Sequence, residues 1–546
     1  MKRQRSKTTS AADRALFLNL FTSIAEEMGV TLARTAYSPN IKERRDFSCA
    51  IFDPMCNMIA QAAHIPVHLG AMPMSVQIAV DVCGPLNRGD IIILNDPFQG
   101  GTHLPDITLV SGVYSGRRSK LVGYLASRAH HADIGGMTPG SLPLSREIFQ
   151  EGLQLPPVHF YRDGELNDDL LSILLCNVRT PDERRGDLLA QVAAHRVGEE
   201  RLQDAAAYHG RKTLHVHMQT LLDYGEQLMR SLIQDLPDGS YDFEDELDDD
   251  GQGNTKLPIQ VQLTVRGDNV GLDFTGTAPA CAGNLNAVAA ITHSAVYYCF
   301  LSLLATPRGA SAEAVIDPPL NSGCFRPIHL RIPDGSLLNA PARSAVAGGN
   351  VETSQRIVDV VFGALSKALP GAIPAASQGT MNNVTLGGYD PIRSKPFAYY
   401  ETIGGGMGAR PAVNGVDAVQ SHMTNTLNTP IEALEFAYPF RVLRYEIVNM
   451  TGGRGRTSGG NGLRRDLQAM CDMRGAVLSE RRVSQPYGLD GGQAGQPGKN
   501  RIHSDGRTRS IPAKCEVELQ AGDILSLQTP GGGGLGRPPR KSKSKK

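Results

Sequence analysis

The first long segment with a clear hydrophobic period runs from Ala15 to Ala36. Its apolar residues recur at helical spacing, at Phe17, Leu20, Phe21, Ile24 and Met28. A Thr/Ser-rich start precedes them, so the segment predicts an amphipathic entry helix. The next apolar run, Phe47 to Ile59, contains a turn signal at Asp53-Pro54 and predicts a β-hairpin.

Two more periodic stretches lie between Glu183 and Leu236. The first passes through Leu188, Leu189, Val192 and Val197, and the second through Leu214, Met218, Leu221, Leu222 and Leu228. Because both patterns have the helical period, they predict two long helices that form a helical insert or a layer between lobes.

Strand patterns occupy much of the remaining chain. Residues 90–94 and 120–127 are rich in β-formers, and each delivers a polar motif at its C-terminal end. Residues 259–265 alternate apolar with polar, and the turn at 267–269 leads into a second strand, which predicts a hairpin. From there to the end we expect short strands separated by glycine-rich turns, apart from a helix near Gln355 to Leu369.

The patterns together predict a mixed α/β (α+β) fold with several lobes, β-rich, with a helical insert and a glycine-rich C-terminal half. With 546 residues the chain exceeds the size at which a single core stops growing. The expected division is a basic tail (1–11), an N-terminal α/β lobe (12–182), a helical segment (183–240), a glycine-rich β/α lobe (241–536) and a second basic tail (537–546).

Composition is typical of a globular protein, with 41% hydrophobic and 20% charged residues. No apolar run approaches a membrane span, and the basic start leads into an amphipathic stretch instead of a signal core, so we expect a cytoplasmic protein with no membrane association. The nine cysteines are scattered and contain no C-x-x-C pair, which indicates a reduced compartment. The formal net charge of +0 combines two basic tails with an acidic body.

Several ligand classes are disfavoured. The 59 glycines form clusters but no G-x-x-x-x-G-K-[ST] and no dinucleotide-binding fingerprint, so a bound nucleotide is expected elsewhere than on this chain. The segment from Gly452 to Arg465 is similar in composition to RGG segments, but it lacks aromatic residues for stacking, and we expect no nucleic-acid partner. No G-x-S-x-G elbow is present, which disfavours a serine nucleophile.

The residues with the clearest chemistry lie in two polar segments. The first, Asn95 to Asp106, reads N-D-P-F-Q-G-G-T-H-L-P-D, and the second, Ser127 to Gly136, reads S-R-A-H-H-A-D-I-G-G. If the segments lie on adjacent strands, His103 and Asp106 converge with His131 and Asp133. Imidazole and carboxylate together suit Mn²⁺, Fe²⁺ or Zn²⁺. The alternative is that these histidines are hydrogen-bonded scaffold residues.

Other polar residues are candidates for the same site. In Glu43 to Ser48, either Glu43 or Asp46 can complete a ligand set or act as a general base, although an ordinary ion pair with the neighbouring arginines is as good an explanation. His64 and His68 can line the cleft, but a buried, hydrogen-bonded role is the more common one. For Glu147 and Glu151 we expect solvated carboxylates.

The two polar segments resemble the hydantoinase B/oxoprolinase family, as do E-R-R-D-F-S-C-A (43–50), H-I-P-V-H-L-G-A-M-P (64–73), E-T-I-G-G-G-M-G-A-R-P (401–411) and T-P-G-G-G-G-L-G (529–536). The resemblance covers residues 12–536. Met407 stands where the family usually has an aromatic residue, and Thr451 where serine is common. Neither departure touches the His/Asp segments.

The resemblance implies that this chain is the catalytic B-type subunit of an ATP-dependent enzyme. Members open hydantoins or 5-oxoproline, or carboxylate ketones, together with an A-type ATPase subunit that binds the ATP. A hetero-oligomer, a divalent metal (Mn, Zn or Fe) and a cyclic amide or ketone substrate are therefore expected. We assign metal-binding roles to His103, Asp106, His131, Asp133 and Glu43, and catalytic roles to Asp46 and His130. A ketone carboxylase subunit and a non-catalytic scaffold for the A-type subunit remain alternatives.

Overall fold

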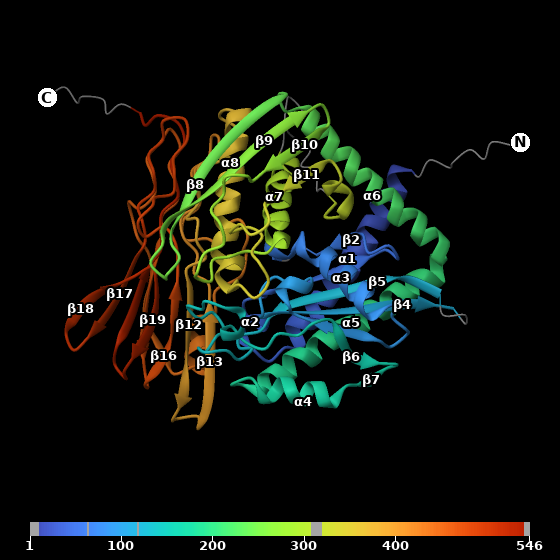
Figure 1. Cartoon of the computed structure of the whole chain (residues 1–546), viewed down its shortest axis with the longest axis horizontal. Coiled ribbons are helices and arrows are strands. Elements are labelled where there is room, and N and C mark those ends of the chain that lie inside the picture. The colour runs from blue at the N-terminus through green and yellow to red at the C-terminus, as the bar shows by residue number, and fades with distance from the viewer. Residues whose placement is uncertain (1–9, 63–64, 117–119, 307–318, 540–546) are drawn as a thin grey trace, which may run out of the picture.

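The N-terminal half is built around an antiparallel sheet of seven strands in the order β2-β1-β5-β4-β3-β6-β7. The computed structural model of the chain describes residues 10–62, 65–116, 120–306 and 319–539 (Figure 1). In sheet order the strands are β2 (Met58–Gln61), β1 (Phe47–Phe52), β5 (Lys120–His130), β4 (Asp106–Ser115), β3 (Ile91–Leu94), β6 (Val158–Arg162) and β7 (Glu165–Leu166). The β1–β2 pairing confirms the predicted hairpin.

Helices cover both faces of this sheet, so its central strands are buried on two sides. On one face lie α1 (Ala11–Thr35), α5 (Pro181–His209) and α6 (Arg211–Gln234), which confirm the predicted entry helix and the predicted helical pair. On the other face lie η1 (Pro66–His68) and α3 (Ala71–Cys83). The short helices α2 (Pro39–Lys42), η2 (Pro97–Gln99), η3 (Ile148–Gln150) and α4 (Asp168–Cys176) belong to the loops.

The helix α1 is long and apolar enough to cross a membrane by length and composition alone. Its side chains of Phe17, Phe21 and Met28 are buried in the core that α1 forms with β1, β5 and α5. A core helix passes the same length and composition test. Ser10 begins the helix with a capping box, in which the Ser10 hydroxyl accepts from the Asp13 N–H and the Asp13 carboxylate accepts from the Ser10 N–H.

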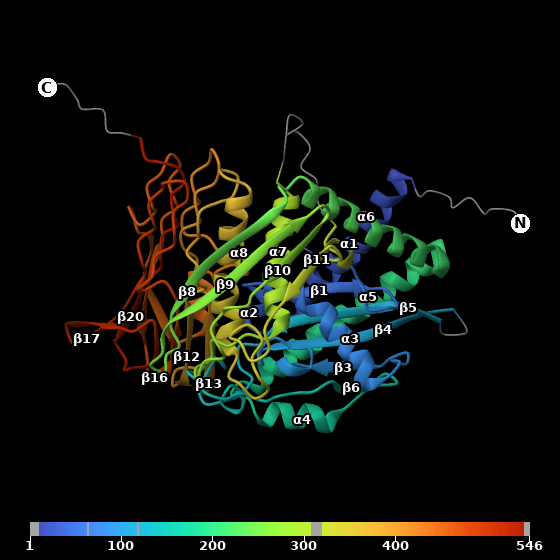
Figure 2. The same cartoon turned by 45° about the horizontal axis from the view of Figure 1, so that its top comes forward.

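The middle of the chain adds a four-stranded sheet and two central helices. The strands are β8 (Gly239–Asp249), β9 (Thr255–Arg266), β10 (Asn269–Asp273) and β11 (Ile328–Arg331), and β9–β10 is the predicted hairpin. Helix α8 (Ser354–Ala368), also predicted, packs on β8 and β9, and α7 (Ala289–Leu304) packs between α8 and α3 (Figure 2). The short helices η4 (Ser322–Phe325) and η5 (Gly349–Thr353) precede β11 and α8.

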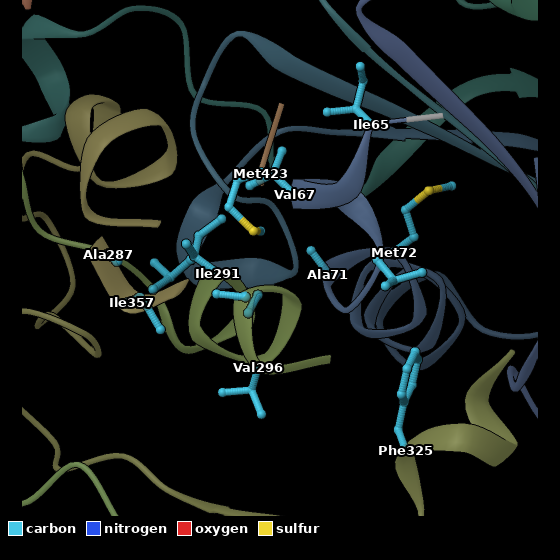
Figure 3. Packing of buried hydrophobic residues seen from close by; sticks show 14 of the residues in the cluster. Ile65, Val67, Ala71, Met72, Ala287, Ile291, Val296, Phe325, Ile357 and Met423 are labelled. Atoms are coloured by element: carbon cyan, nitrogen blue, oxygen red, sulfur yellow. The ribbon is translucent and has the colours of Figure 1, made fainter. Parts of the chain in front are cut away.

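The expectation of turns and strands alone between the hairpin and residue 355 is wrong, because α7 lies there. Its residues are apolar almost all round, and eleven of sixteen are buried, so the sequence shows no polar stripe from which a helical period can be read. Figure 3 shows the reason for this composition. Ile291 of α7 lies between Ala71 of α3 and Ile357 of α8, and Val296, which is also buried, lies on another side of α7.

Two sheets form the C-terminal lobe, on the left in Figure 1. The four-stranded sheet contains β13 (Lys395–Glu401), β12 (Asn383–Asp390), β16 (Met473–Leu478) and β19 (Lys514–Leu519). The five-stranded sheet contains β14 (Phe440–Ile447), β15 (Leu463–Ala469), β20 (Ile524–Gln528), β17 (Lys499–Ser504) and β18 (Arg507–Ile511), and α9 (Ile431–Ala437) precedes it. The sheet and helix content confirms the predicted α+β class.

The glycine clusters of this lobe pack backbone against backbone. Gly532 donates to the carbonyl of Gly460 at 2.9 Å, Gly460 donates to Met407 at 2.8 Å, and Gly453 donates to Gly532 at 2.8 Å. A Cβ added at Gly460 would overlap the carbonyl group of Val416. Glycine is therefore needed in these clusters because the backbones of neighbouring segments lie too close together to leave room for a side chain.

We expect Gly460→Ala to lower the free energy of unfolding by about 1–3 kcal/mol, because its methyl group must push a backbone segment aside. Gly271→Ala in β10 is the matched control, since a Cβ there meets nothing within 4 Å. Denaturant unfolding of both variants measures the difference. Equal stabilities of the two variants would show that the segments yield easily.

Candidate active site

Three of the predicted site residues meet where β4 begins and β5 ends. The antiparallel register pairs Asp106 with His130, and His103 lies in the turn just before β4. One ligand atom from each of His103, Asp106 and His130 lies within 4.8 Å of the other two, and all three residues are buried. The Nε2 atom of His103 is 3.2 Å from Oδ1 of Asp106. We call these three residues the His/Asp cluster.

His68 and Asp46 border the His/Asp cluster. His68 Nε2 lies 3.5 Å from Oδ2 of Asp106, and its Nδ1 contacts the Ser48 hydroxyl at 2.9 Å. His68 therefore has the buried, hydrogen-bonded environment that we expected, but within the site. The backbone carbonyl of Asp46 accepts from the His130 N–H at 3.0 Å. His64 lies outside the described residues.

Hydrogen bonds fix His103 and Asp106, and most of them come from a segment far away in the sequence. The Nδ1 atom of His103 contacts the carbonyl of Ala347 at 3.3 Å. The side-chain amide of Asn350 lies 3.1 Å from His103 Nε2 and 3.4 Å from Asp106 Oδ2, and the Thr102 hydroxyl donates to Asp106 Oδ2 at 2.7 Å. Asn350 belongs to η5, which is a π-helix, a conformation found often at functional sites.

Glu151 stabilises the segment that contains Ala347, whose carbonyl contacts His103. Its carboxylate accepts from the backbone N–H groups of Val346 and Ala347, at 2.9 and 3.0 Å, and from the Ser145 hydroxyl at 2.7 Å. The expectation that Glu151 is solvated is wrong: it is fully buried, and burial raises its pKa to about 7. Glu147 is exposed, as expected.

His130 is fixed on its other side by an aromatic stack and an amide. Its ring stacks on Tyr400 with centroids 4.4 Å apart, and the guanidinium of Arg44 lies 5.0 Å from the centroid of the same tyrosine ring. The Asn40 amide donates to the His130 carbonyl at 2.6 Å and lies 3.3 Å from Nδ1. Asn40 comes from α2, which follows directly on α1.

The electrostatics of the cluster favour a charged carboxylate beside imidazoles. Burial alone would raise the pKa of Asp106, but His103 and His68 hold it well below its ordinary value. Burial would lower the pKa of His103, yet Asp106 raises it. Burial and then the charge of His103 keep the pKa of His130 well below normal, and burial raises that of Asp46.

The structure does not bring the other three predicted ligands into the cluster. His131 points to the opposite face of the sheet, where its Nε2 contacts Gln191 at 3.0 Å. The Asp133 carboxylate pairs with Arg179 at 2.8 Å and accepts from the backbone of Arg179. Glu43 lines a separate cleft of about 750 Å³ beside α2.

Chain geometry explains this separation. Successive residues of a strand point to opposite faces, so only one histidine of the His130-His131 pair can face Asp106. Asp133 lies beyond the end of β5, where its carboxylate holds the turn that follows.

A sequence profile of the hydantoinase B/oxoprolinase family matches residues 11–538. The chain belongs to the hydantoinase B/oxoprolinase family. This confirms the resemblance seen in the sequence motifs.

Two relatives illustrate the range of the family. This hydantoinase B/oxoprolinase chain is 39% identical to 5-oxoprolinase 1 of Arabidopsis thaliana over 96% of its own length, but it covers 41% of that protein. It is 32% identical to a Pseudomonas sp. (strain NS671) protein that is provisionally named as the B-type component of a D-/L-hydantoinase, over 94% of this chain and 88% of that one. The chain thus spans about two fifths of the oxoprolinases and most of the hydantoinase component.

Two solved structures share the fold. The ATP-dependent caprolactamase from Pseudomonas jessenii superposes with a TM-score of 0.89 at 27% identity, covering 98% of this chain and 93% of that chain. A nucleotide-free acetone carboxylase superposes with a TM-score of 0.85 at 17% identity, covering 97% of this chain and 77% of that one, a likeness of fold alone.

The donor set of this hydantoinase B/oxoprolinase chain fits a divalent ion. His130 Nε2 is buried and has no hydrogen-bond partner among the described residues. Asp106 Oδ1 is also buried, and there it has the ion-pair contact with His103 Nε2 but no hydrogen bond; both are ligand-type atoms. Two imidazoles with one or two carboxylates suit Mn²⁺, Fe²⁺ or Zn²⁺ better than Mg²⁺ or Ca²⁺.

Several site residues escaped the sequence reasoning. Asn350 and Tyr400 approach the cluster from more than two hundred residues away, and no local spacing links them to it. The only available signals were the Gly348-Gly349 pair before Asn350 and the position of Tyr400 directly before a family motif at Glu401.

Substitution of Asn350 tests whether its contacts with His103 and Asp106 contribute to metal binding. We expect Asn350→Ala to weaken divalent-metal binding by about 10–100-fold, because partners that orient ligands contribute that much to affinity. Asn87→Ala, on the exposed loop before β3, is the matched control. Titration with Mn²⁺ compares the two, and equal affinities would leave Asn350 without a role in orienting the ligands.

Proposed function

We propose that this chain is the B-type catalytic subunit of an ATP-dependent cyclic-amide hydrolase of the hydantoinase/5-oxoprolinase type. The buried His/Asp cluster, in which His130 Nε2 has no hydrogen-bond partner among the described residues, carries the proposal. The full-length likeness to a caprolactamase, an enzyme named for a cyclic amide, supports it.

Within the cluster, His103, Asp106 and His130 are the residues that would hold a divalent ion, with the Asp46 carboxylate as a fourth candidate. Such an ion would supply Lewis-acid polarisation and a water acidic enough to ionise near neutral pH. His130 thereby moves from the predicted catalytic role to a metal-holding role. His131, Asp133 and Glu43 are not part of this proposal.

The surrounding residues orient the site and exclude water from it. The Ala347 carbonyl at Nδ1 of His103 favours the tautomer whose Nε2 lone pair faces the cluster. Tyr400 and Asn40 fix the ring of His130. If Asp46 stays outside the ligand set, its carboxylate is the candidate to accept a proton from the attacking water.

Ring opening also needs activation of the amide, because a five-membered lactam is a poor electrophile. We infer that an A-type ATPase subunit transfers the γ-phosphoryl group of ATP to the amide carbonyl oxygen, with release of ADP, which converts that oxygen into a leaving group. The relatives named 5-oxoprolinase are more than twice as long as this chain, so they have room for such a second part. The absence of a P-loop here agrees with this division of labour.

The test is co-expression with a neighbouring A-type subunit, followed by metal analysis and measurement of ATP turnover. Hydantoins, 5-oxoproline, caprolactam and acetone with bicarbonate are the substrates to compare. We expect a cyclic amide to stimulate ATP turnover with release of the ring-opened acid. Bicarbonate-dependent product from the ketone would instead establish the carboxylase alternative, and no stimulation by any substrate would contradict the enzymatic proposal.

A further inference from the structure

Among the described residues, the six largest fully buried side chains are all arginines. Four of them have a carboxylate within ion-pair distance: Arg184 with Asp187, Arg356 with Asp359, Arg465 with Glu401 and Arg481 with Asp245. This is the usual condition for a charge in a protein core, because an unpaired buried charge is costly.

The other two, Arg44 and Arg128, have no carboxylate within that distance in the described part of the chain. Both border the His/Asp cluster. Arg128 precedes His130 by two residues on β5, so the two side chains share one face of the sheet. Arg44 precedes Asp46 by two residues. The exceptions to the pairing rule therefore lie beside the proposed site.

Neutral groups hold the Arg128 guanidinium in place. Its Nε donates to the Thr108 hydroxyl at 2.8 Å, and its Nη2 donates to the Ser75 hydroxyl at 2.6 Å and to the Gly100 carbonyl at 3.4 Å. Its Nη1 is buried and has no partner among the residues described. One donor edge of a fixed, fully buried cation is thus left free.

The position of Arg128 connects it to the cluster. Its neighbour across β1 is Ser48, whose hydroxyl contacts His68, and His68 in turn contacts Asp106. On the other side, Thr108 follows Asp106 by two residues on the same face of β4. Arg128 therefore lies one row along the sheet from the proposed metal ligands.

Arg44, the second of these arginines, is also held by uncharged groups. Its donors bind the Thr402 hydroxyl at 2.7 Å, the Tyr400 carbonyl at 3.2 Å and the Asn40 side chain. Of its nitrogen atoms only Nε has no partner among the described residues. Arg44 thus contributes positive charge near Asp46 and stiffens the segments around His130.

The positive charge of Arg128 beside the site favours the binding of an anion. If a divalent ion takes up the charge of Asp46 and Asp106, the Arg128 guanidinium remains without a countercharge, whereas Arg44 still has the Glu401 carboxylate nearby. A neutral carbonyl oxygen of the substrate would leave the charge of Arg128 unbalanced. An oxyanion supplies both the countercharge and an acceptor for Nη1, and oxyanions are the groups that arginine binds best.

From this geometry we infer that Arg128, through Nη1 and with the charge of Arg44 nearby, forms an oxyanion-binding subsite beside the His/Asp cluster. The subsite would take a phosphoryl or carboxylate group of the substrate. The inference rests on the proposed function for the location of the reaction, and it adds that the bound substrate is anionic. No covalent step is involved.

The experiment uses the full chain, with and without Mn²⁺, titrated with inorganic phosphate and separately with acetate in a calorimeter. Arg128→Lys keeps the charge but loses the free donor edge, and Arg128→Met removes both. We expect wild-type protein to bind phosphate, Arg128→Lys to bind it at least about tenfold more weakly, and Arg128→Met to show no saturable binding. Arg331→Met, at an exposed arginine, should bind like wild type.

Thermal unfolding separates this role from a merely structural one. Phosphate should raise the melting temperature of wild type but not of Arg128→Met, and without ligand Arg128→Met should melt no lower than wild type, because it removes an unpaired buried charge. If Arg128→Met does not fold, the Arg128→Lys titration decides.

Acetate binding that depends on Arg128, without phosphate binding, would identify a carboxylate as the group recognised. Equal phosphate and acetate affinities in wild type and Arg128→Lys, or no binding of either anion to wild type, would overturn the inference. Metal content measured on the same samples keeps this result distinct from the proposed function, since metal can bind normally while the anion does not.

Discussion

For the proposed function, Asp106→Asn is expected to remove nearly all metal-dependent ring opening while the protein stays folded. Asparagine keeps the size of the side chain and an oxygen acceptor for the Thr102 hydroxyl. It loses the negative charge that faces both His103 and His68 at 3.2 and 3.5 Å. We expect Mn²⁺ affinity to fall by at least about 100-fold and ATP-dependent turnover by about 10³-fold, since the ion supplies several kcal/mol to such reactions.

Asp133→Asn is the control from the same pair of motifs. Its carboxylate is also fully buried, but it pairs with Arg179 instead of joining the cluster. Folded Asp133→Asn protein should bind Mn²⁺ with wild-type stoichiometry, even if it is less stable. Full metal occupancy in Asp106→Asn, or its loss in folded Asp133→Asn, would contradict the proposed ligand set.

The largest expected loss of stability follows from Glu401→Gln in β13. Glu401 and Arg465 are both fully buried and form an ion pair at 2.7 Å. The carboxylate also accepts from the backbone of Thr429 at 2.8 Å, which ties β13 to the segment before α9. Neutralising Glu401 leaves the Arg465 charge buried and unpaired, and we expect a loss of about 3–5 kcal/mol in the free energy of unfolding.

Two further variants are compared with Glu401→Gln: a double variant of the same ion pair, and a variant of an exposed ion pair. The double variant Glu401→Gln/Arg465→Met should recover most of the lost stability, because no unpaired charge remains. Asp273→Asn breaks the pair with Arg331, which is 75% exposed, and should cost less than about 1 kcal/mol. A double variant as unstable as Glu401→Gln would show that the pair is not the source of the effect.

The same pair gives a pH dependence. Burial would raise the pKa of Glu401, but Arg465 and Arg44 hold it below its ordinary value. The carboxylate therefore contributes stability that is fully present above the unfolded pKa of about 4.3 and is lost as pH falls through the lower folded value. Urea unfolding between pH 3 and 7 should show a smaller loss in Glu401→Gln than in wild type; the loss that remains comes from other carboxylates with lowered pKa, such as Asp245 and Asp248.

Local sequence patterns predicted helices and strands that have one buried face and one exposed, polar face. Helix α6 and strand β9 of the β9–β10 hairpin were readable because each has a polar side that gives its sequence a period. Helix α7 was not readable, because neighbours bury it on nearly all sides and its sequence has no polar stripe. Periodicity reports exposure, so an element without an exposed face carries no period.

The sequence by itself determined the family, the α+β class and the two segments that supply the His/Asp cluster, because long motifs of rare composition need no knowledge of the fold. The choice among neighbouring polar residues needed the tertiary structure. His130 and His131 are equivalent in the sequence, and only the pairing of β4 with β5 shows which of them faces Asp106.

The same holds for the partners of the site. Asn350, Tyr400 and the unpaired state of Arg128 depend on segments that meet only in the folded chain. A motif specifies which side chains are available. Whether a side chain faces a ligand, an arginine or a helix is decided by packing between segments far apart in sequence, about which local patterns carry no information.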